Sequence, residues 1–270
     1  CADGRGVHIE IRLYHSEKRM DLLYQMIKLP VQTPEGVYVA FPLHLEGGKL
    51  AFEAQGGVVY PGVNQLEGSS SDWNTIQNFA SVKSPDAQIV FVSKDIPLVQ
   101  FGAINTGRYY YRLNPATSHL YSWVLNNYWV TNFKASQEGE LRWRYSLTSS
   151  ADPSDLFATR FGWGVRTPLL SRVLLPSKGS SPGKPVSVSL ANLGAPNILL
   201  VQAGLALDGK SIALQVREVE GKPAILDITG LQAATRSAKA VETNILEEEG
   251  AVLTAPVALK PYETKFIKLY

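Results

Sequence analysis

The residues best suited to bind a ligand are aromatic rings placed beside amides. Trp73 precedes an asparagine, residues 109–111 are three tyrosines, and residues 123–132 read WVLNNYWVTN. Sugars present apolar C–H faces that pack on aromatic rings, and hydroxyls that hydrogen-bond to amides. These segments therefore suit carbohydrate contact. The candidate residues are Trp73, Trp123, Asn127, Trp129 and Asn132.

The competing interpretation is structural. Aromatic residues are common in strands and fill the core between two sheets. Asparagines such as Asn126, Asn127 and Asn132 often hold turns through their side chains. On this view the rings are core residues and the amides are turn residues, so the number of rings that point inward decides between the two interpretations.

Motifs for metal binding and nucleophilic catalysis are missing. The four histidines, His8, His15, His44 and His119, include no pair four residues apart, and H-E-x-x-H does not occur. No expected strand-to-helix turn carries a G-x-S-x-G elbow, no phosphate-binding glycine loop is present, and the single cysteine is Cys1. The sequence therefore predicts no catalytic residue and no metal site in this chain.

Carboxylate pairs are harder to exclude, because a fold can bring any two Asp or Glu residues together for glycoside hydrolysis. The run Glu247 to Glu249 is best interpreted as a solvated turn. Glu242 and Glu263 lie among basic residues near the end of the chain, where capping or ion pairing is the simpler role.

Composition limits the class of protein further. The chain has 270 residues, of which 45% are hydrophobic and 19% charged. Its 26 basic and 24 acidic residues give a net charge of +2, too balanced for binding that depends on neutralising nucleic-acid phosphates. No apolar run approaches the roughly 18 residues of a membrane-spanning helix. We therefore expect neither a nucleic-acid partner nor a membrane span.

Alternation of apolar and polar residues predicts antiparallel strands. Apolar side chains occupy every second position from Val7 to Leu13 and again from Leu141 to Leu147. Gly47-Gly48 suggests a hairpin turn between the runs that flank it. Further strands are expected at 21–29, 36–45, 49–54, 58–61, 76–82, 88–92 and 120–130.

The regularly spaced strands predict an all-β protein of two modules. A large antiparallel sandwich covers residues 1–175 and includes one short helix near 153–161, where Pro153 suits a first turn and Gly162 and Gly164 suit an end. Residues 176–185, PSKGSSPGKP, have the composition of a linker. A smaller β-sandwich follows at 186–270.

Three stretches resemble the β-rich C-terminal region of glycoside hydrolase family 38, the α-mannosidases. Residues 34–42, PEGVYVAFP, are similar to a family strand that reads E-x-x-Y-x-A-F-P. Residues 126–133, NNYWVTNF, followed by Gly139 and residues 142–147, resemble N-x-x-W-x-T-N…G…R-Y-S-L. Residues 242–248 and 259–266 resemble the closing pair of family strands.

The resemblance implies a galactose-mutarotase-like supersandwich followed by a smaller sandwich, within a retaining, zinc-dependent α-mannosidase. It also implies that the zinc ligands and the aspartate nucleophile belong to an N-terminal catalytic domain that this chain lacks, so no catalytic residue is assigned here. We therefore expect a non-catalytic region that packs on its own catalytic domain and helps to shape a site for mannose-containing glycans. The alternatives are a stand-alone carbohydrate-binding module and a purely structural interaction domain.

Cys1 and the compartment carry weaker expectations. Cys1 suits the lipidated first residue of a processed bacterial lipoprotein, but no flexible tether follows it, and a piece of a longer protein is the preferred interpretation. A chain almost free of cysteine fits several compartments. A periplasmic or other extracytoplasmic location is favoured over the cytoplasm.

Trp143 tests the predicted strand at 141–147. If its ring is in the core, replacing Trp143 with Ala should lower the free energy of unfolding by about 3–5 kcal/mol. Chemical denaturation measures this loss, and a variant as stable as the parent would contradict the strand assignment.

Overall fold

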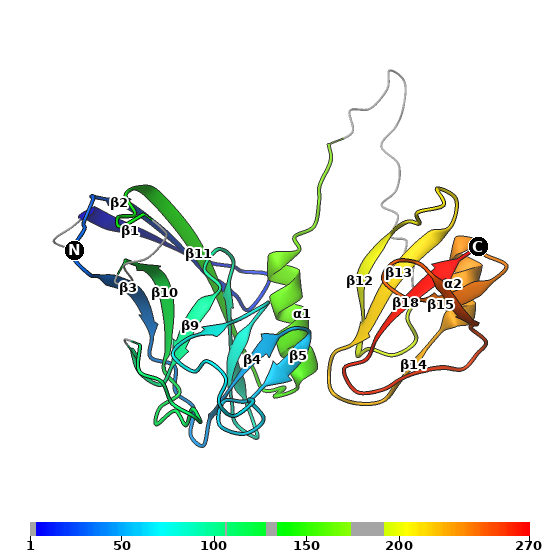
Figure 1. Ribbon diagram of the computed structural model, residues 1–270, viewed down its shortest axis with the longest axis horizontal. Helices are drawn as coiled ribbons and strands as arrows, with labels where there is room; N and C mark the ends of the chain where they lie inside the picture. The colour runs from blue at the N-terminus through cyan, green and yellow to red at the C-terminus, as the bar shows by residue number, and fades with distance from the viewer. Residues whose placement is uncertain (1–3, 106, 128–133, 174–191) are drawn as a thin grey trace. The chain divides into compact units, whose positions relative to one another are not determined.

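The computed structural model describes residues 4–105, 107–127, 134–173 and 192–270 (Figure 1). The chain divides into two compact units, residues 1–168 and 169–270. The expected linker at 176–185 and the first residues of the expected smaller sandwich, 186–191, lie outside the described residues, so the linker stays a prediction.

The first unit is built on a seven-stranded antiparallel sheet with β1 at one edge and β5 at the other. Register aligns apolar residues on one face: Trp143 pairs with Tyr24, and Tyr145 pairs with Leu22. In sheet order the strands are β1 (Gly4–Leu13), β2 (Met20–Lys28), β11 (Gly139–Ser150), β8 (Gln88–Ser93), β7 (Ala80–Lys83), β4 (Lys49–Ala54) and β5 (Gly57–Val59).

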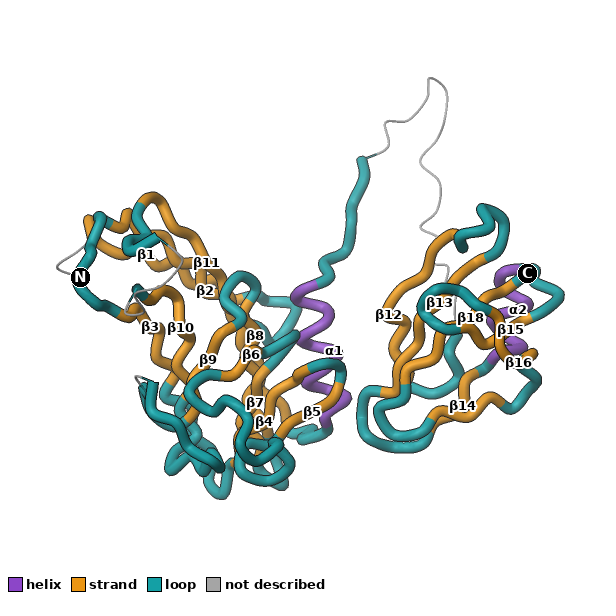
Figure 2. Tube along the Cα trace, viewed as in Figure 1, coloured by secondary structure: helices purple, strands orange, loops and turns teal. Residues whose placement is uncertain are grey.

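A four-stranded antiparallel sheet faces this inner surface (Figure 2). Phe41 from the smaller sheet packs against Phe91 and Tyr145 of the larger one, with ring centroids 4.7 and 5.0 Å away. The Tyr145 hydroxyl donates to Ser122 Oγ at 2.8 Å. The predicted all-β sandwich is therefore confirmed. The smaller sheet contains β3 (Gly36–Phe41), β10 (Leu120–Asn126), β9 (Leu98–Phe101) and β6 (Asn74–Thr75).

The hairpin expected at Gly47-Gly48 is wrong. The chain does turn there, with Gly47 at a φ of +64°. The flanking strands belong to different sheets, because β3 pairs with β10 whereas β4 pairs with β5 and β7. The turn therefore carries the chain from one layer of the sandwich to the other.

The expected helix is longer than its sequence suggests. Helix α1 runs Asp155–Arg166, with Ser154 as its N-cap, and continues through both glycines that were expected to end it. A Cβ at Gly162 would lie 2.9 Å from the backbone oxygen of Asn78. Gly162 is therefore an interior residue that lets the helix approach the sheet closely.

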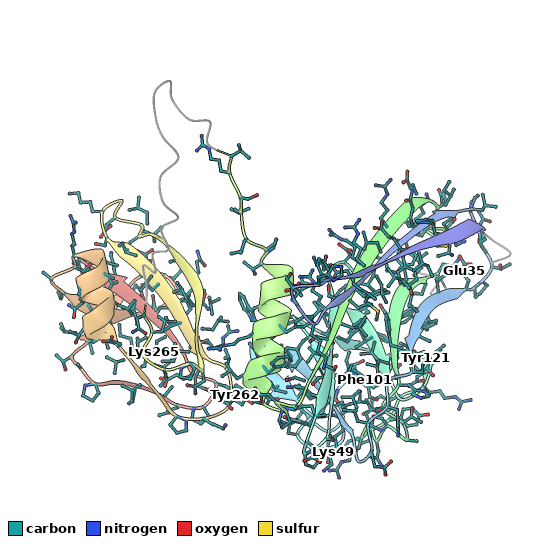
Figure 3. All side chains as sticks on the ribbon, turned by 180° about the vertical axis from the view of Figure 1, so that it is seen from behind. Glu35, Lys49, Phe101, Tyr121, Tyr262 and Lys265 are labelled. Atoms are coloured by element: carbon teal, nitrogen blue, oxygen red, sulfur yellow. The ribbon has the colours of Figure 1, made fainter. Side chains whose placement is uncertain are left out.

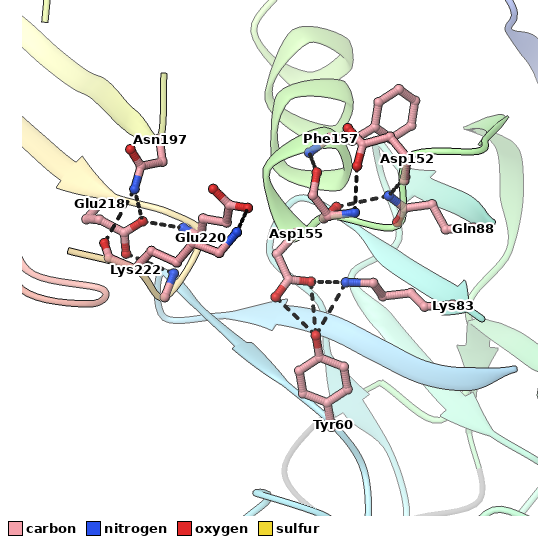
Figure 4. Close-up of polar contacts among 12 residues, drawn as sticks. Tyr60, Lys83, Gln88, Asp152, Asp155, Phe157, Asn197, Glu218, Glu220 and Lys222 are labelled. Atoms are coloured by element: carbon pink, nitrogen blue, oxygen red, sulfur yellow. Dashed lines mark hydrogen bonds and ion pairs between the residues drawn. The ribbon is translucent and has the colours of Figure 1, made fainter. Parts of the chain in front are cut away.

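Helix α1 covers the outer face of the large sheet. Ala158 and Val165 pack with Phe79 and Val92 of that face. Asp155 forms an ion pair with Lys83 and accepts a hydrogen bond from the Tyr60 hydroxyl (Figure 4). The first turn of the helix is thereby fixed to the sheet by charge, and the remaining turns are fixed by apolar packing.

The second unit contains a five-stranded and a two-stranded antiparallel sheet. Helix α2 (Ile228–Thr235), capped by Asp227, buries Ile228 and Leu231 in the core of this unit and was not anticipated from the sequence. Neither α1 nor α2, the helices of the described residues, has the length and apolarity needed to cross a bilayer. The strands are β12 (Ile198–Leu205), β13 (Ile212–Glu218), β18 (Thr264–Leu269), β15 (Ala240–Thr243), β16 (Glu249–Val252), β14 (Ala224–Leu226) and β17 (Val257–Leu259).

Buried Glu218 organises the loops at one end of the second unit. Its carboxylate accepts from Asn197 Nδ2 at 2.8 Å and from the backbone N–H groups of Glu220, Gly221 and Tyr262 at 2.7–2.9 Å (Figure 4). One side chain thus satisfies donors from three segments that are distant in sequence.

Asp21 has the corresponding role on the outer face of the large sheet. Its carboxylate accepts from Arg19, from the Tyr14 hydroxyl and from Ser146 Oγ, at 2.6–2.8 Å. Burial alone would raise the pKa of Asp21, but the hydrogen bonds from Arg19, Ser146 and Tyr14 outweigh it and hold the pKa below its ordinary 3.8. The ionised carboxylate is therefore a stabilising group.

Replacing Asp21 with Asn should lower the free energy of unfolding at neutral pH by about 1–3 kcal/mol, because charged hydrogen bonds are lost. A depressed folded-state pKa gives stability that is present above 3.8 and is lost as pH falls through the folded value. The gap between the parent and Asp21→Asn should therefore close below about pH 4. Urea titrations at several pH values measure it, and a constant gap would contradict the assignment.

Candidate functional site

An aromatic stack occupies the outer face of the four-stranded sheet. Trp123 on β10 and Tyr38 on β3 pair directly in register, and their rings stack at 5.8 Å with planes 8° apart. Trp73, which immediately precedes β6, meets Trp123 edge-on at 5.4 Å. Ser122, the neighbour of Trp123, points into the core toward Tyr145, so strand alternation turns Trp123 outward.

The rings of this stack differ in exposure. Trp123 is only 3% exposed, whereas Tyr38 and Trp73 are half-buried. Tyr121 lies on the same outer face and pairs with Gln100 of β9; Figure 3 labels it beside Phe101. The structure thus brings together two sequence candidates, Trp73 and Trp123, and adds Tyr38. Of these three residues, Trp73 and Tyr38 keep part of their surface exposed to solvent.

Asn127 holds backbone segments together. Its Oδ1 accepts from the backbone N–H of Glu35 at 2.6 Å, and its Nδ2 donates to the carbonyls of Val31 and Ala135 at 2.8 and 3.1 Å. The side chain is buried and its amide is occupied on both sides. The remaining candidates, Trp129 and Asn132, lie outside the described residues.

A polar pocket lies at Asp72, the residue before Trp73. Its volume is about 470 Å³, within the range of about 300–1,000 Å³ typical of small-molecule sites. Asp72, Gln100, Arg108 and Tyr110 are among its lining residues. Sequence reasoning noted Tyr110 within the tyrosine triplet but missed the other three. The sequence signal for Asp72 was its position beside Trp73 in a polar loop.

Gln100 lines this pocket and also holds part of its wall in place. It is 1% exposed, and its amide forms two hydrogen bonds with the backbone of Asn105, at 2.8 and 2.9 Å. The Asn105 side chain in turn bonds both backbone groups of Arg108. These contacts connect Gln100, Asn105 and Arg108 along one wall of the pocket.

Burial raises the pKa of Asp72 above its ordinary 3.8. Its Oδ1 is shielded from solvent and has no hydrogen-bond partner among the described residues. Burial without hydrogen-bond donors destabilises the ionised form of a carboxyl group, and donors from a ligand would reduce that cost.

The described residues contain no group of three or more His, Cys, Asp or Glu side chains that converge as a metal site. The zinc that the family resemblance implies belongs to a separate catalytic domain, and no chemical step in this chain is assigned to a metal.

The fold is that of a sandwich region found in larger enzymes. No family model and no curated protein matches the sequence. An alpha-mannosidase from Enterococcus faecalis V583 matches 98% of this chain with a TM-score of 0.66 and 11% identity. A protein in glycosyl hydrolase family 38 from Enterococcus faecalis matches 98% with a TM-score of 0.65 and 12% identity. This chain spans 29% and 30% of those two chains, and at these identities the likeness shows a shared fold.

Replacing Asn127 with Ala should destabilise the first unit by about 1–3 kcal/mol, because buried backbone groups of Val31, Glu35 and Ala135 lose their partner. Thermal unfolding measures the loss. The matched control is Asn64→Ala, since Asn64 also bonds backbone groups, of Val58 and Tyr60, but is exposed; an Asn127 variant no less stable than the control would contradict the structural role.

Proposed function

We propose that this chain is the non-catalytic C-terminal region of an α-mannosidase-like glycoside hydrolase. In this role it packs against a zinc-dependent catalytic domain and helps to shape the sugar site of that domain. The observation that carries the proposal is the match of nearly the whole chain to less than a third of an alpha-mannosidase. The three sequence stretches similar to family 38 support it independently.

An uncovered apolar strip on β1 gives this role a physical basis. Val7, Ile9, Ile11 and Leu13 are all exposed, Ile11 at 60% and Leu13 at 74%. We refer to these four side chains as the β1 strip. Exposed apolar surface that is continuous with a core is characteristic of a covered interface.

Register shows which face the β1 strip occupies. Ile9 pairs with Tyr24 and Ile11 with Leu22, and paired residues in a sheet point to the same side. Tyr24 and Leu22 pack in the core between the two sheets. The β1 strip therefore continues the inner face of the sandwich past the area that the smaller sheet covers.

We assign the β1 strip to the catalytic domain of the same polypeptide. In the solved relatives about 70% of each chain lies outside the part that this chain matches, which supplies a partner large enough to cover a ten-residue strand. The opposite face of β1 carries His8, Glu10 and Arg12 and suits solvent.

A second candidate is a stand-alone carbohydrate-binding module. The observation that favours it is the grouping of Trp73, Tyr38 and Trp123 beside a polar pocket, because an aromatic platform with nearby polar groups suits sugars. The deep burial of Trp123 favours a structural role for that ring. The two functions differ in whether the chain acts alone.

The coding sequence upstream of Cys1 tests the first proposal directly. We expect the reading frame to continue through a domain with the His-x-Asp zinc motif of the family. We also expect the 270-residue chain alone to release no product from an aryl α-mannoside, measured by absorbance. A start codon immediately before this chain, or turnover by the chain alone, would sink the proposal.

Substitution on the β1 strip tests the interface. In the longer polypeptide, Ile11→Asp should lower the free energy of unfolding by about 1.5–3 kcal/mol, the contribution of burying such a side chain. In the chain alone the same change should have little effect, because Ile11 is exposed there. His8→Asp, on the opposite face, is the matched control; equal effects of Ile11→Asp in the two contexts would contradict the assignment.

A further inference from the structure

We propose that the pocket beside Trp73 is a subsite for a neutral sugar or related polyol, with Asp72 accepting from ligand hydroxyls, Arg108 donating to them and Tyr110 packing on the ring. This subsite deepens the proposed function and rests on it only for the choice of a mannoside as the first probe.

The pocket is built before any ligand arrives. Ser71 Oγ donates to the carbonyl of Tyr110 at 2.8 Å and accepts from its backbone N–H at 3.2 Å. Gln100 and Asn105 fix the loop on the other side through side-chain to backbone bonds. Binding therefore does not have to order these walls, which lowers its entropic cost.

The same contacts leave the functional groups available. Ser71 holds Tyr110 only through backbone atoms, so the phenol ring, in a residue 46% exposed, remains free to line the pocket. Asn105 likewise holds Arg108 through backbone atoms. None of the described residues accepts a hydrogen bond from the Arg108 guanidinium. Structure and recognition are thus divided between different atoms of the same residues.

Among the residues that line the pocket, Asp72 gives the strongest indication of a ligand site. A shielded carboxylate oxygen without a donor among the described residues is costly, and native proteins satisfy nearly all such atoms. Burial also raises the pKa of this carboxyl, which shows that the ionised form is under-stabilised. Oδ1 itself is too shielded to meet a ligand, but Asp72 lines the pocket, and a hydroxyl that donates to its other carboxylate oxygen would stabilise the ionised form.

The mixture of groups selects the class of ligand. A cation would suit Asp72 but would be repelled by Arg108, and an anion would suit Arg108 but would be repelled by Asp72. Neighbouring hydroxyls of a neutral sugar serve both, because each hydroxyl donates one hydrogen bond and accepts others. Tyr110 then offers an aromatic face to the C–H groups of the same ring.

Titration of the 270-residue chain with methyl α-D-mannopyranoside, followed by ¹H–¹⁵N NMR, tests the subsite. We expect shifts at the residues around Asp72 and Tyr110, with binding at millimolar ligand. Asp72→Asn should weaken the affinity about tenfold or more, the usual contribution of hydrogen bonds to a charged group. Tyr110→Ala should also weaken the affinity, because it removes the ring that packs on the sugar and keeps the backbone bonds to Ser71.

The matched control is Asp86→Asn, an exposed carboxylate in the turn between β7 and β8. It should leave the affinity unchanged. Asp72→Asn should unfold at a temperature no lower than the parent, so a loss of binding is not a loss of fold. Wild-type affinity in Asp72→Asn, shifts that map elsewhere, no binding, or tighter binding of inorganic phosphate than of the mannoside would each overturn the subsite.

Failure here is distinguishable from failure of the proposed function. The subsite is measured as binding by the 270-residue chain, whereas the proposed function is measured by the upstream coding sequence and by the stability of the longer polypeptide. A chain that binds no mannoside but whose β1 strip is buried in the longer polypeptide would refute the subsite alone.

Discussion

The first unit depends on the contact between two inner sheet faces around Tyr145. This ring is fully buried and packs with Phe41, Phe91 and Tyr24. Its hydroxyl would be costly there without a partner, and Ser122 of the opposite sheet supplies one. Burial raises the pKa of Tyr145, so the hydroxyl stays protonated and able to donate. A single polar pair thus fixes how the two layers align within an otherwise apolar interior.

The position of the candidate site follows from that alignment. Because Ser122 points inward, the adjacent Trp123 must point outward, and Tyr38 follows through its register with Trp123. Phe101 is a core residue, so Gln100 beside it also faces outward, where it organises the loop over the pocket. The residues that build the interior and those that build the outer surface therefore alternate along the same two strands, β9 and β10.

Periodicity predicted much of the fold, because the alternation at 141–147 and the run at 49–54 record which face is buried. It could not predict strand pairing: Gly47-Gly48 specifies a turn, but not that the turn joins two sheets. Nor could it show that Gly162 belongs inside a helix, since the reason is the nearby Asn78 backbone. Asn127 looked like a ligand contact because its three backbone partners are visible only in space. Asp72 was missed because its position beside Trp73 in a polar loop does not reveal that its carboxylate lacks a donor.

The place of β1 at the margin of its sheet has a consequence for handling the separated polypeptide. One edge of this strand hydrogen-bonds to β2, while the other edge pairs with no strand of the described residues and lies next to exposed apolar side chains. An exposed strand edge beside apolar side chains pairs readily with a strand of another molecule, which promotes aggregation. Glu10 and Arg12 place charged side chains along the same edge, and such charges oppose pairing with a second molecule. Solubility of the isolated sandwich is therefore set by a few side chains at its rim rather than by its well-packed interior.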